Sequence, residues 1–303
     1  MRNSVSEPAP AKVNLYLHVL GRRDDGYHEL QSLVAFARDG DRVSAAPADR
    51  WSLSVDGPFA SPLAADGADG NLVLRAARRL LEEDCAEGDA AAKGGKAAFT
   101  LTKNLPVAAG IGGGSADAAA ALRCLHKLSG RSPGPPEDWA GLGADIPVCL
   151  LNRPALVSGM GEQLAAAPHV PALPAVLVNP GVPSGTGAVF NALAGRFGQP
   201  AVSPLPAQAD CRTPAAFCAW LAGTRNDLTA AAVATVPPVA DVLNALSAAP
   251  GSLMARMSGS GATCFGLFPT ERAAIQAAGW LASRCGDWWV CPTVLEGSPE
   301  RAA

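Results

Sequence analysis

The chain has 303 residues and a formal net charge of −3, from 24 basic and 27 acidic side chains. This near-balance lacks the basic excess of a nucleic-acid coat, and a hydrophobic content of 49% excludes a disordered tail. No apolar run approaches the roughly 20 residues that a membrane span needs, and residues 1–13 show no secretory leader. We therefore expect a cytoplasmic protein of about two domains that acts on a small molecule, without nucleic-acid or membrane partners. Its oligomeric state stays open.

The eight cysteines form no Cys-x-x-Cys pair and do not cluster with histidine. In a chain of this length, they are typical of free thiols in a reducing compartment. His126 and His169 have no partner at the spacing of metal ligands, so the sequence predicts no protein-built metal centre.

Alternating apolar residues in the N-terminal third predict strands, and repetition at i, i+4 predicts one helix. The first strand alternates apolar positions with Asn14, Tyr16 and His18, so we expect one buried face and a solvent-facing His18. A charged, glycine-rich turn follows, and Asn71 is placed to cap the helix. The expected elements are strands at 13–19, 27–36, 53–55 and 97–101, a turn at 21–26, and a helix at 71–83.

The remaining chain alternates helical and extended patterns without a strict strand–helix–strand rhythm. This pattern predicts an α+β fold with two lobes, which we assign to residues 1–155 and 156–303. The expected helices are 115–128, 239–248 and 270–283, and the expected strands are 175–178, two around 258–262, and 288–294. Gly and Pro break the chain at 129–136, and the Pro- and Ala-rich stretch 198–214 is predicted to be a surface connection.

The sharpest local signal is a run with four glycines in five positions, Gly110 to Gly114, ending at Ser115. Without side chains, backbone N–H groups can converge on one point, and the helix that follows directs its free N-terminal donors there as well. This arrangement predicts a phosphate site. It is not a Walker A loop, because no Gly-Lys-Ser/Thr follows, and its spacing fails as a dinucleotide fingerprint.

Two charged residues stand in apolar surroundings. Asp145 is the one carboxylate of the run 144–151, so it is either a helix cap or salt-bridge partner, or a functional group. Lys12 begins an apolar strand, where a side chain reaching solvent at an edge is the commoner outcome. A Lys–Asp pair near a phosphate loop would favour catalysis. The segment 259–262 is by itself typical of a hairpin turn.

Three segments in this order resemble the motifs of the GHMP kinases, which include galactokinase, homoserine kinase and mevalonate kinase. They are Ala9–Leu15, Pro106–Ala116 and Ser258–Ala262. The resemblance implies an N-terminal lobe like ribosomal protein S5 and a C-terminal ferredoxin-like lobe. It also implies ATP as co-substrate, with Mg²⁺.

Further segments are similar to one branch of that family, which acts in the non-mevalonate, or methylerythritol phosphate, pathway to isoprenoid precursors. They are Gly21–Leu30, the triple glycine of 112–114, Leu142–Pro147 and Asn179–Val182. The resemblance covers residues 8 to 295 and implies phosphorylation of a hydroxyl on a cytidylylated polyol. Another GHMP kinase should lack the first two segments, and a non-catalytic nucleotide-binding regulator would not need Lys12 with Asp145.

The resemblance implies roles for individual residues. Asp145 matches the catalytic aspartate that faces the acceptor hydroxyl, and Lys12 matches the lysine paired with it. The loop ends in one serine where the family usually has two, because Ala116 occupies the second position, so Ser115 alone supplies a hydroxyl. The ATP and phosphate positions are Asn71, Lys103, Pro106, Gly110, Gly112, Gly113, Gly114 and Ser115; the substrate positions are Asn14, Tyr27, His28, Thr186 and Phe190; and the third-motif loop is Gly259, Ser260 and Gly261.

Overall fold

The computed structural model describes residues 4–61, 70–83, 95–167, 169–193, 195, 197 and 211–298. The chain forms two compact units, each assembled from separate stretches of sequence. The first unit comprises Met1–Ala11, Gly40–Val107 and Gly112–Leu151, and the second comprises Lys12–Asp39, Ala108–Ile111 and Asn152–Ala303. The last segment of the first unit ends at Leu151, and two segments of the N-terminal half belong to the second unit.

The two longest strands contribute to both units. β1 (Val5–Arg22) passes from the first unit to the second after Ala11, and its partner β2 (His28–Ala48) returns to the first unit after Asp39. The predicted glycine turn joins them, closed by a 2.8 Å hydrogen bond from the N–H of Arg23 to the carbonyl of Tyr27.

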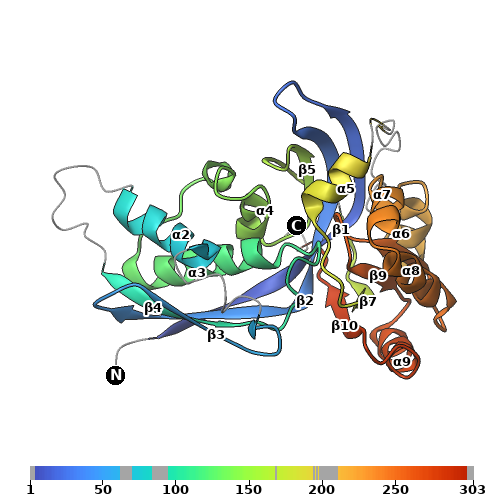
Figure 1. Ribbon diagram of the computed structural model, residues 1–303. Coiled ribbons are helices and arrows are strands. Elements are labelled where there is room, and N and C mark those ends of the chain that lie inside the picture. The colour runs from blue at the N-terminus through green and yellow to red at the C-terminus, as the bar shows by residue number, and fades with distance from the viewer. Residues whose placement is uncertain are drawn as a thin grey trace. The chain divides into compact units, whose positions relative to one another are not determined.

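The sheet of the first unit has the strand order β3–β4–β2 (Figure 1). β3 (Ser52–Asp56) pairs parallel with β4 (Lys96–Thr102), which pairs antiparallel with the second half of β2. The register places Val43 opposite Leu101, and both are fully buried. Because successive side chains of a strand point to opposite faces, the alternating apolar residues share one buried face of the sheet.

Two helices, α2 (Leu72–Arg78) and α3 (Gly113–Ser129), pack against each other over this sheet (Figure 1). The segment 116–121 of α3 is buried throughout, and its small alanine side chains allow close approach of neighbouring elements. Three shorter elements complete the unit: a π-helical turn η2 (Arg79–Glu83), a 3₁₀ turn η4 (Pro136–Trp139) and α4 (Ile146–Leu151).

The sheet of the second unit has the order β2–β10–β7–β9–β8, and β2 also pairs with β5, which pairs with β6. All of these pairs are antiparallel. The strands are β5 (Ala155–Gly159), β6 (Gln163–Ala166), β7 (Leu173–Asn179), β8 (Met254–Met257), β9 (Cys264–Leu267) and β10 (Trp289–Leu295). The helices are α5 (Thr186–Ala192), α6 (Pro214–Leu221), α7 (Thr229–Thr235), α8 (Pro238–Ala248) and α9 (Glu271–Ala282).

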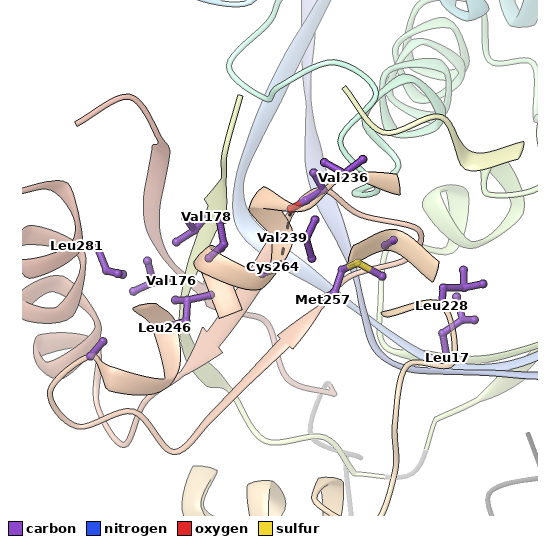
Figure 2. Close-up of a cluster of buried hydrophobic side chains, with 14 of the residues drawn as sticks. Leu17, Val176, Val178, Leu228, Val236, Val239, Leu246, Met257, Cys264 and Leu281 are labelled. Atoms are coloured by element: carbon purple, nitrogen blue, oxygen red, sulfur yellow. Dashed lines mark hydrogen bonds between the residues drawn. The ribbon is translucent and has the colours of Figure 1, made fainter. Parts of the chain in front are cut away.

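An aliphatic core fills the second unit (Figure 2). Val176 and Val178 of β7 pack with Leu246 of α8 and Leu281 of α9, and all four are fully buried. β7 is buried at every position, which explains its continuous apolar sequence. This core fixes the strands that carry the third-motif loop.

The prediction of a half-buried first strand with a solvent-facing His18 is wrong. His18 is fully buried, and its ring stacks on Tyr16 at 4.9 Å between centroids. The Trp220 ring from α6 covers Tyr16 at 6.2 Å, so residues 13–19 are buried on both faces. Alternation shows which side chains share a face, but it does not show whether that face meets water. Burial, reinforced by repulsion from Arg225, lowers the pKa of His18.

The α+β class is confirmed, and every predicted helix and strand is present in the described residues. The sequence analysis missed β5 and β6 and the short helices α4 to α7. Residues 198–210 of the predicted surface connection lie outside the described part of the chain. In that described part, no helix is long and apolar enough to cross a membrane, and no cluster of three potential metal-ligating side chains occurs. The seven cysteines it includes are free thiols.

Candidate functional site

The glycine run is divided between the two units of the chain. Gly110 lies in the second unit, where it packs on the third-motif loop: a Cβ atom on Gly110 would be 2.5 Å from the carbonyl oxygen of Gly261. The hydroxyl of Ser258 donates to the Gly110 carbonyl at 3.2 Å, and the N–H of Thr263 donates to Ala109 at 3.1 Å. The predicted second and third motifs are therefore in direct contact.

Asn226 holds the third-motif loop, and sequence reasoning missed it. Its amide donates at 2.8 Å to the carbonyls of both Met257 and Gly259. On the other side of the loop, the hydroxyls of Ser260 and Thr186 are 2.9 Å apart. The loop thus joins Thr186, at the start of α5, to the glycine run, and these predicted site residues come together.

Two predicted residues on β1 lie beside this loop. The backbone N–H of Asn14 donates to the hydroxyl of Ser258 at 3.1 Å, and its amide donates to Ser32 at 2.8 Å. The Oδ1 atom of Asn14 is buried and makes no hydrogen bond with any described residue, so it can accept one from a ligand. The N–H of Lys12 donates to the carbonyl of Ile111 at 2.9 Å, and the residue is buried, not an exposed edge lysine.

An aromatic group stands at the start of β2. The ring centroid of His28 lies 4.9 Å from that of Phe190 on α5 and 6.0 Å from that of Phe197. Tyr27, the residue directly before His28, is 63% exposed. Burial, with a smaller contribution from Arg22, lowers the pKa of His28. A neutral imidazole offers one donor and one acceptor beside apolar rings, which suits a heterocyclic base.

In the first unit, α3 begins at Gly113, two residues before the predicted start. Gly112 precedes it with φ 63°, a conformation that glycine adopts without strain. The first helical hydrogen bond within α3 runs from the N–H of Ala116 to Gly112, so the N–H groups of 113–115 have no helical acceptor. Such a helix start binds anions, and this one is where the sequence predicts a phosphate.

Asp145 stands directly before α4, and its carbonyl accepts from Cys149 at 3.1 Å. The helix is tied to α3, because Arg123 donates to the Cys149 carbonyl at 3.1 Å. A Cβ atom on Gly143 would be 3.7 Å from the hydroxyl oxygen of Ser115, so the Gly-Ala-Asp segment and the start of α3 are neighbours. The structure thus brings the predicted phosphate loop close to the segment that carries the predicted catalytic aspartate.

Lys12 belongs to the second unit and Asp145 to the first, so their pairing stays a prediction. Asn71 caps α2 as predicted, accepting from the N–H of Val73 at 2.9 Å. Its role toward adenosine, and that of Pro106, which is buried, also stay predictions.

Lys103 is enclosed by two carboxylates that sequence reasoning missed. Its ammonium is hydrogen-bonded to Asp41 of β2, and to Asp117 of α3 at 2.9 Å. The side chains of Lys103, Asp41 and Asp117 are 3%, 0% and 4% exposed, so this ion cluster is removed from water. It lies beneath the start of α3, since a Cβ atom on Gly113 would be 3.0 Å from the Lys103 Nζ atom.

Comparison with known proteins gives two family matches. The models described as "GHMP kinases N terminal domain" and "GHMP kinases C terminal" match residues 71–164 and 212–285. The 4-diphosphocytidyl-2-C-methyl-D-erythritol kinase of Ruegeria pomeroyi is 50% identical over 93% of this chain and 95% of its own length. The enzyme of that name from Methylobacterium radiotolerans is 50% identical over 96% of this chain and 99% of its own length.

Solved structures agree with these matches. A crystal structure of 4-(cytidine 5'-diphospho)-2C-methyl-D-erythritol kinase is 34% identical, with a TM-score of 0.77 over 97% of this chain and 100% of the other. Homoserine kinase from Cytophaga hutchinsonii, at 18% identity and a TM-score of 0.62 over 98% of this chain and 96% of the other, shows the shared fold alone.

Proposed function

Because the chain belongs to the family of 4-diphosphocytidyl-2-C-methyl-D-erythritol kinases, a branch of the GHMP kinases, we propose that it performs their reaction. It transfers the γ-phosphoryl group of ATP to the 2-hydroxyl of 4-diphosphocytidyl-2-C-methyl-D-erythritol, in the non-mevalonate pathway to isoprenoid precursors. The observation that carries this proposal is the proximity of Ser115, at the start of α3, to Gly143, in the segment that carries Asp145. Both substrates are small molecules, and the reaction takes place in the cytoplasm.

ATP binds at the start of α3. The N–H groups of 113–115 hold the β- and γ-phosphates, because they have no helical acceptors and lie at the positive end of the helix dipole. Gly110 and Gly112 shape the approach of the backbone to these phosphates. Asn71, Lys103 and Pro106 lie in the segments that hold the adenosine part.

Mg²⁺ accompanies the nucleotide. This ion prefers oxygen ligands and keeps several waters, so in kinases it is held largely by substrate phosphates. The described residues contain no cluster of three potential metal-ligating side chains, which fits an ion carried by ATP better than one bound by the protein alone. Ser115 is the one loop hydroxyl that can contribute a ligand. When bound, the ion neutralises charge on the phosphates.

The acceptor binds to the second unit. Tyr27, His28 and Phe190 hold the cytosine ring, with the exposed tyrosine stacking on one face and the neutral imidazole supplying edge hydrogen bonds. The unpaired Oδ1 of Asn14 accepts from a substrate hydroxyl, and Thr186 contributes its own hydroxyl beside the third-motif loop.

Phosphoryl transfer requires positioning and charge stabilisation more than covalent help from the protein. Asp145 orients the 2-hydroxyl and accepts its proton while that oxygen bonds to the γ-phosphorus and ADP leaves. Lys12 pairs with Asp145 and stabilises negative charge on the group in transfer.

The test is ADP release by the full-length protein with a panel of acceptors. The cytidylylated substrate should support turnover, whereas methylerythritol phosphate, homoserine and mevalonate should support almost none. Remote binding energy from the cytidine positions the reacting hydroxyl, so its removal depresses kcat as well as affinity. Equal activity on an acceptor without cytidine would refute the proposed substrate. The activity would then be that of a GHMP kinase with a different acceptor. Lack of ADP release with every acceptor would refute the kinase activity itself.

A further inference from the structure

The buried carboxylates of Asp41 and Asp117, which enclose the Lys103 ammonium, have no part in the reaction described above, and the three residues come from separate segments of the first unit. Asp41 lies on β2, Lys103 directly follows β4, and Asp117 lies in α3. Two carboxylates and one ammonium are costly to bury unless they are well paired. A polar cluster retained at this depth therefore needs an explanation.

Asp41 and Lys103 make several hydrogen bonds to backbone groups of the first unit. The Oδ1 atom of Asp41 accepts from the N–H groups of Asn104 at 2.6 Å and Leu105 at 2.8 Å. The N–H of Lys103 donates to Asp56 at 2.7 Å, and its carbonyl accepts from Phe59 at 3.1 Å. These contacts anchor Lys103 to the sheet, and a hydrogen bond to Asp117 extends from its ammonium to α3.

The ammonium also defines the space beneath the first turn of α3. A Cβ atom on Gly113 would lie 3.0 Å from the Lys103 Nζ atom and 3.7 Å from the Asp41 Oδ2 atom. At the adjacent Gly114, the nearest atom to such a Cβ is the methyl carbon of Leu72, at an ordinary 3.6 Å. The turn whose N–H groups face the phosphates thus rests on the ion cluster at Gly113.

We propose that Lys103 is a positioning residue: held by Asp41, it fixes the first turn of α3 through Asp117 and so sets where the N–H groups of 113–115 meet the phosphates of ATP. The proposal rests on the proposed function, because it assigns the phosphates to that turn. It explains why a lysine expected near adenosine is enclosed by two carboxylates of its own chain.

The electrostatics of the cluster support this role. Burial lowers the pKa of Lys103, but the attraction of Asp117 and Asp41 outweighs it, so the pKa is raised and the ammonium stays charged. Burial raises the pKa of Asp117 against the attraction of Lys103, and repulsion from Asp41 adds to the rise. Asp117 Oδ1 is buried and has no hydrogen-bond partner in the described part of the chain. Asp117 is thus the weakly held member, and a substitution there leaves the Lys103–Asp41 pair intact.

The decisive variant is Asp117→Leu, because it cuts the link to α3 and leaves a neutral, paired Lys103 and Asp41. We expect the KM for ATP, and the dissociation constant of ADP measured by calorimetry, to rise at least tenfold. The KM for the cytidylylated acceptor should stay within twofold, since Tyr27 and His28 lie in the other unit. Asp117→Asn keeps an acceptor for the ammonium and should restore nucleotide affinity to within about threefold of the unaltered protein.

If the cluster only stabilised the fold, Asp117→Leu would give a different result. Fewer molecules would be active, so the apparent kcat would fall while the KM values for ATP and for the acceptor stayed unchanged. Direct contact of the ammonium with ATP predicts unchanged nucleotide affinity in Asp117→Leu, because Lys103 is still present. Either result would overturn the proposal. Should Asp117→Leu fail to fold, Asp41→Asn decides, since it preserves shape but loosens the ammonium; nucleotide affinity within twofold of normal would refute the role. The calorimetric measurement of ADP binding does not depend on turnover, so it tests the role of Lys103 by itself. The proposed kinase activity is tested separately, and absence of ADP release by the unaltered protein would refute it.

Discussion

Gly110 and Gly130 have the same backbone conformation but different surroundings. Substituting each of them by alanine therefore measures how much the contact between the glycine run and the third-motif loop constrains Gly110. Both have φ 74°, in the left-handed region. A Cβ atom on Gly130, at the end of α3, would meet nothing within 4 Å. On Gly110 it would lie 2.5 and 2.8 Å from the O and N atoms of Gly261 and 2.9 Å from the carbonyl oxygen of Ser258.

The expected free energies follow from this difference. A left-handed backbone conformation destabilises an alanine by about 1–2 kcal/mol relative to glycine. Alanine also restricts the unfolded chain, which stabilises the folded state by about 0.4–1 kcal/mol. Gly130→Ala should therefore lower the free energy of unfolding by about 1 kcal/mol. Gly110→Ala adds overpacking against backbone atoms, a further 1–3 kcal/mol or so, for a total of about 2–4 kcal/mol.

Denaturant unfolding followed by tryptophan fluorescence measures both variants, with ADP release as the second readout. Gly110→Ala should lose at least tenfold in kcat/KM, because the loop must move away from Gly261, whereas Gly130→Ala should keep normal kinetics. Equal destabilisation of the two variants, or normal kinetics in Gly110→Ala, would refute the contact between the two motifs.

Asp145→Asn keeps the side-chain shape and removes the proton acceptor, so kcat should fall roughly 10²–10⁴-fold while calorimetry still shows ATP binding; near-normal turnover would make Asp145 structural. Tyr27→Ala should lose roughly ten- to hundredfold in kcat/KM, consistent with one base-stacking contact, and a markedly lower melting temperature would instead place this 63% exposed ring in the fold. Burial raises the pKa of Asp117 to about 7, so the folded chain binds this proton more tightly than the unfolded chain does, and the stabilisation present at low pH is lost as pH rises toward 7. The melting temperature of Asp117→Asn relative to the unaltered protein should accordingly rise between pH 5 and pH 8, and an unchanged or falling difference would contradict the assigned pKa.

Local signals in the sequence predicted the parts of the fold that depend on local physics. The cap at Asn71 and the glycine before α3 follow from the backbone groups that a helix start leaves unpaired. Alternation located the strands but placed His18 in solvent, because its cover comes from a distant segment: the N–H of Arg225 donates to its Nε2 atom, and Trp220 of α6 packs on the adjoining Tyr16. The start of β1 was missed because Pro8 and Pro10 are uncommon inside strands.

The supports of the site could not be predicted, because they join residues far apart in the chain. Asp41 is separated from Lys103 by 62 positions and lies in a charged segment that looks like an ordinary surface turn. Asn226 is 33 positions from Gly259 and has no motif around it. In both cases the side chain's role is set by which backbone groups the fold leaves unpaired nearby, and no local pattern encodes that.

The passage of β1 and β2 through both units constrains how the chain can be made. The second unit requires Lys12–Asp39, which leave the ribosome early, and strand β10, which leaves it after all the other strands described here. Pairing between them closes a loop of more than 250 residues, which is slow to form, so this unit is completed only after β10 has been synthesised. A ribosome that stops after Leu151 would release β1 and β2 with apolar segments uncovered, which makes such a truncated product a candidate for aggregation or proteolysis. For the same reason, a fragment of 152–303 should fold only when the strands at 12–39 are supplied as a separate peptide.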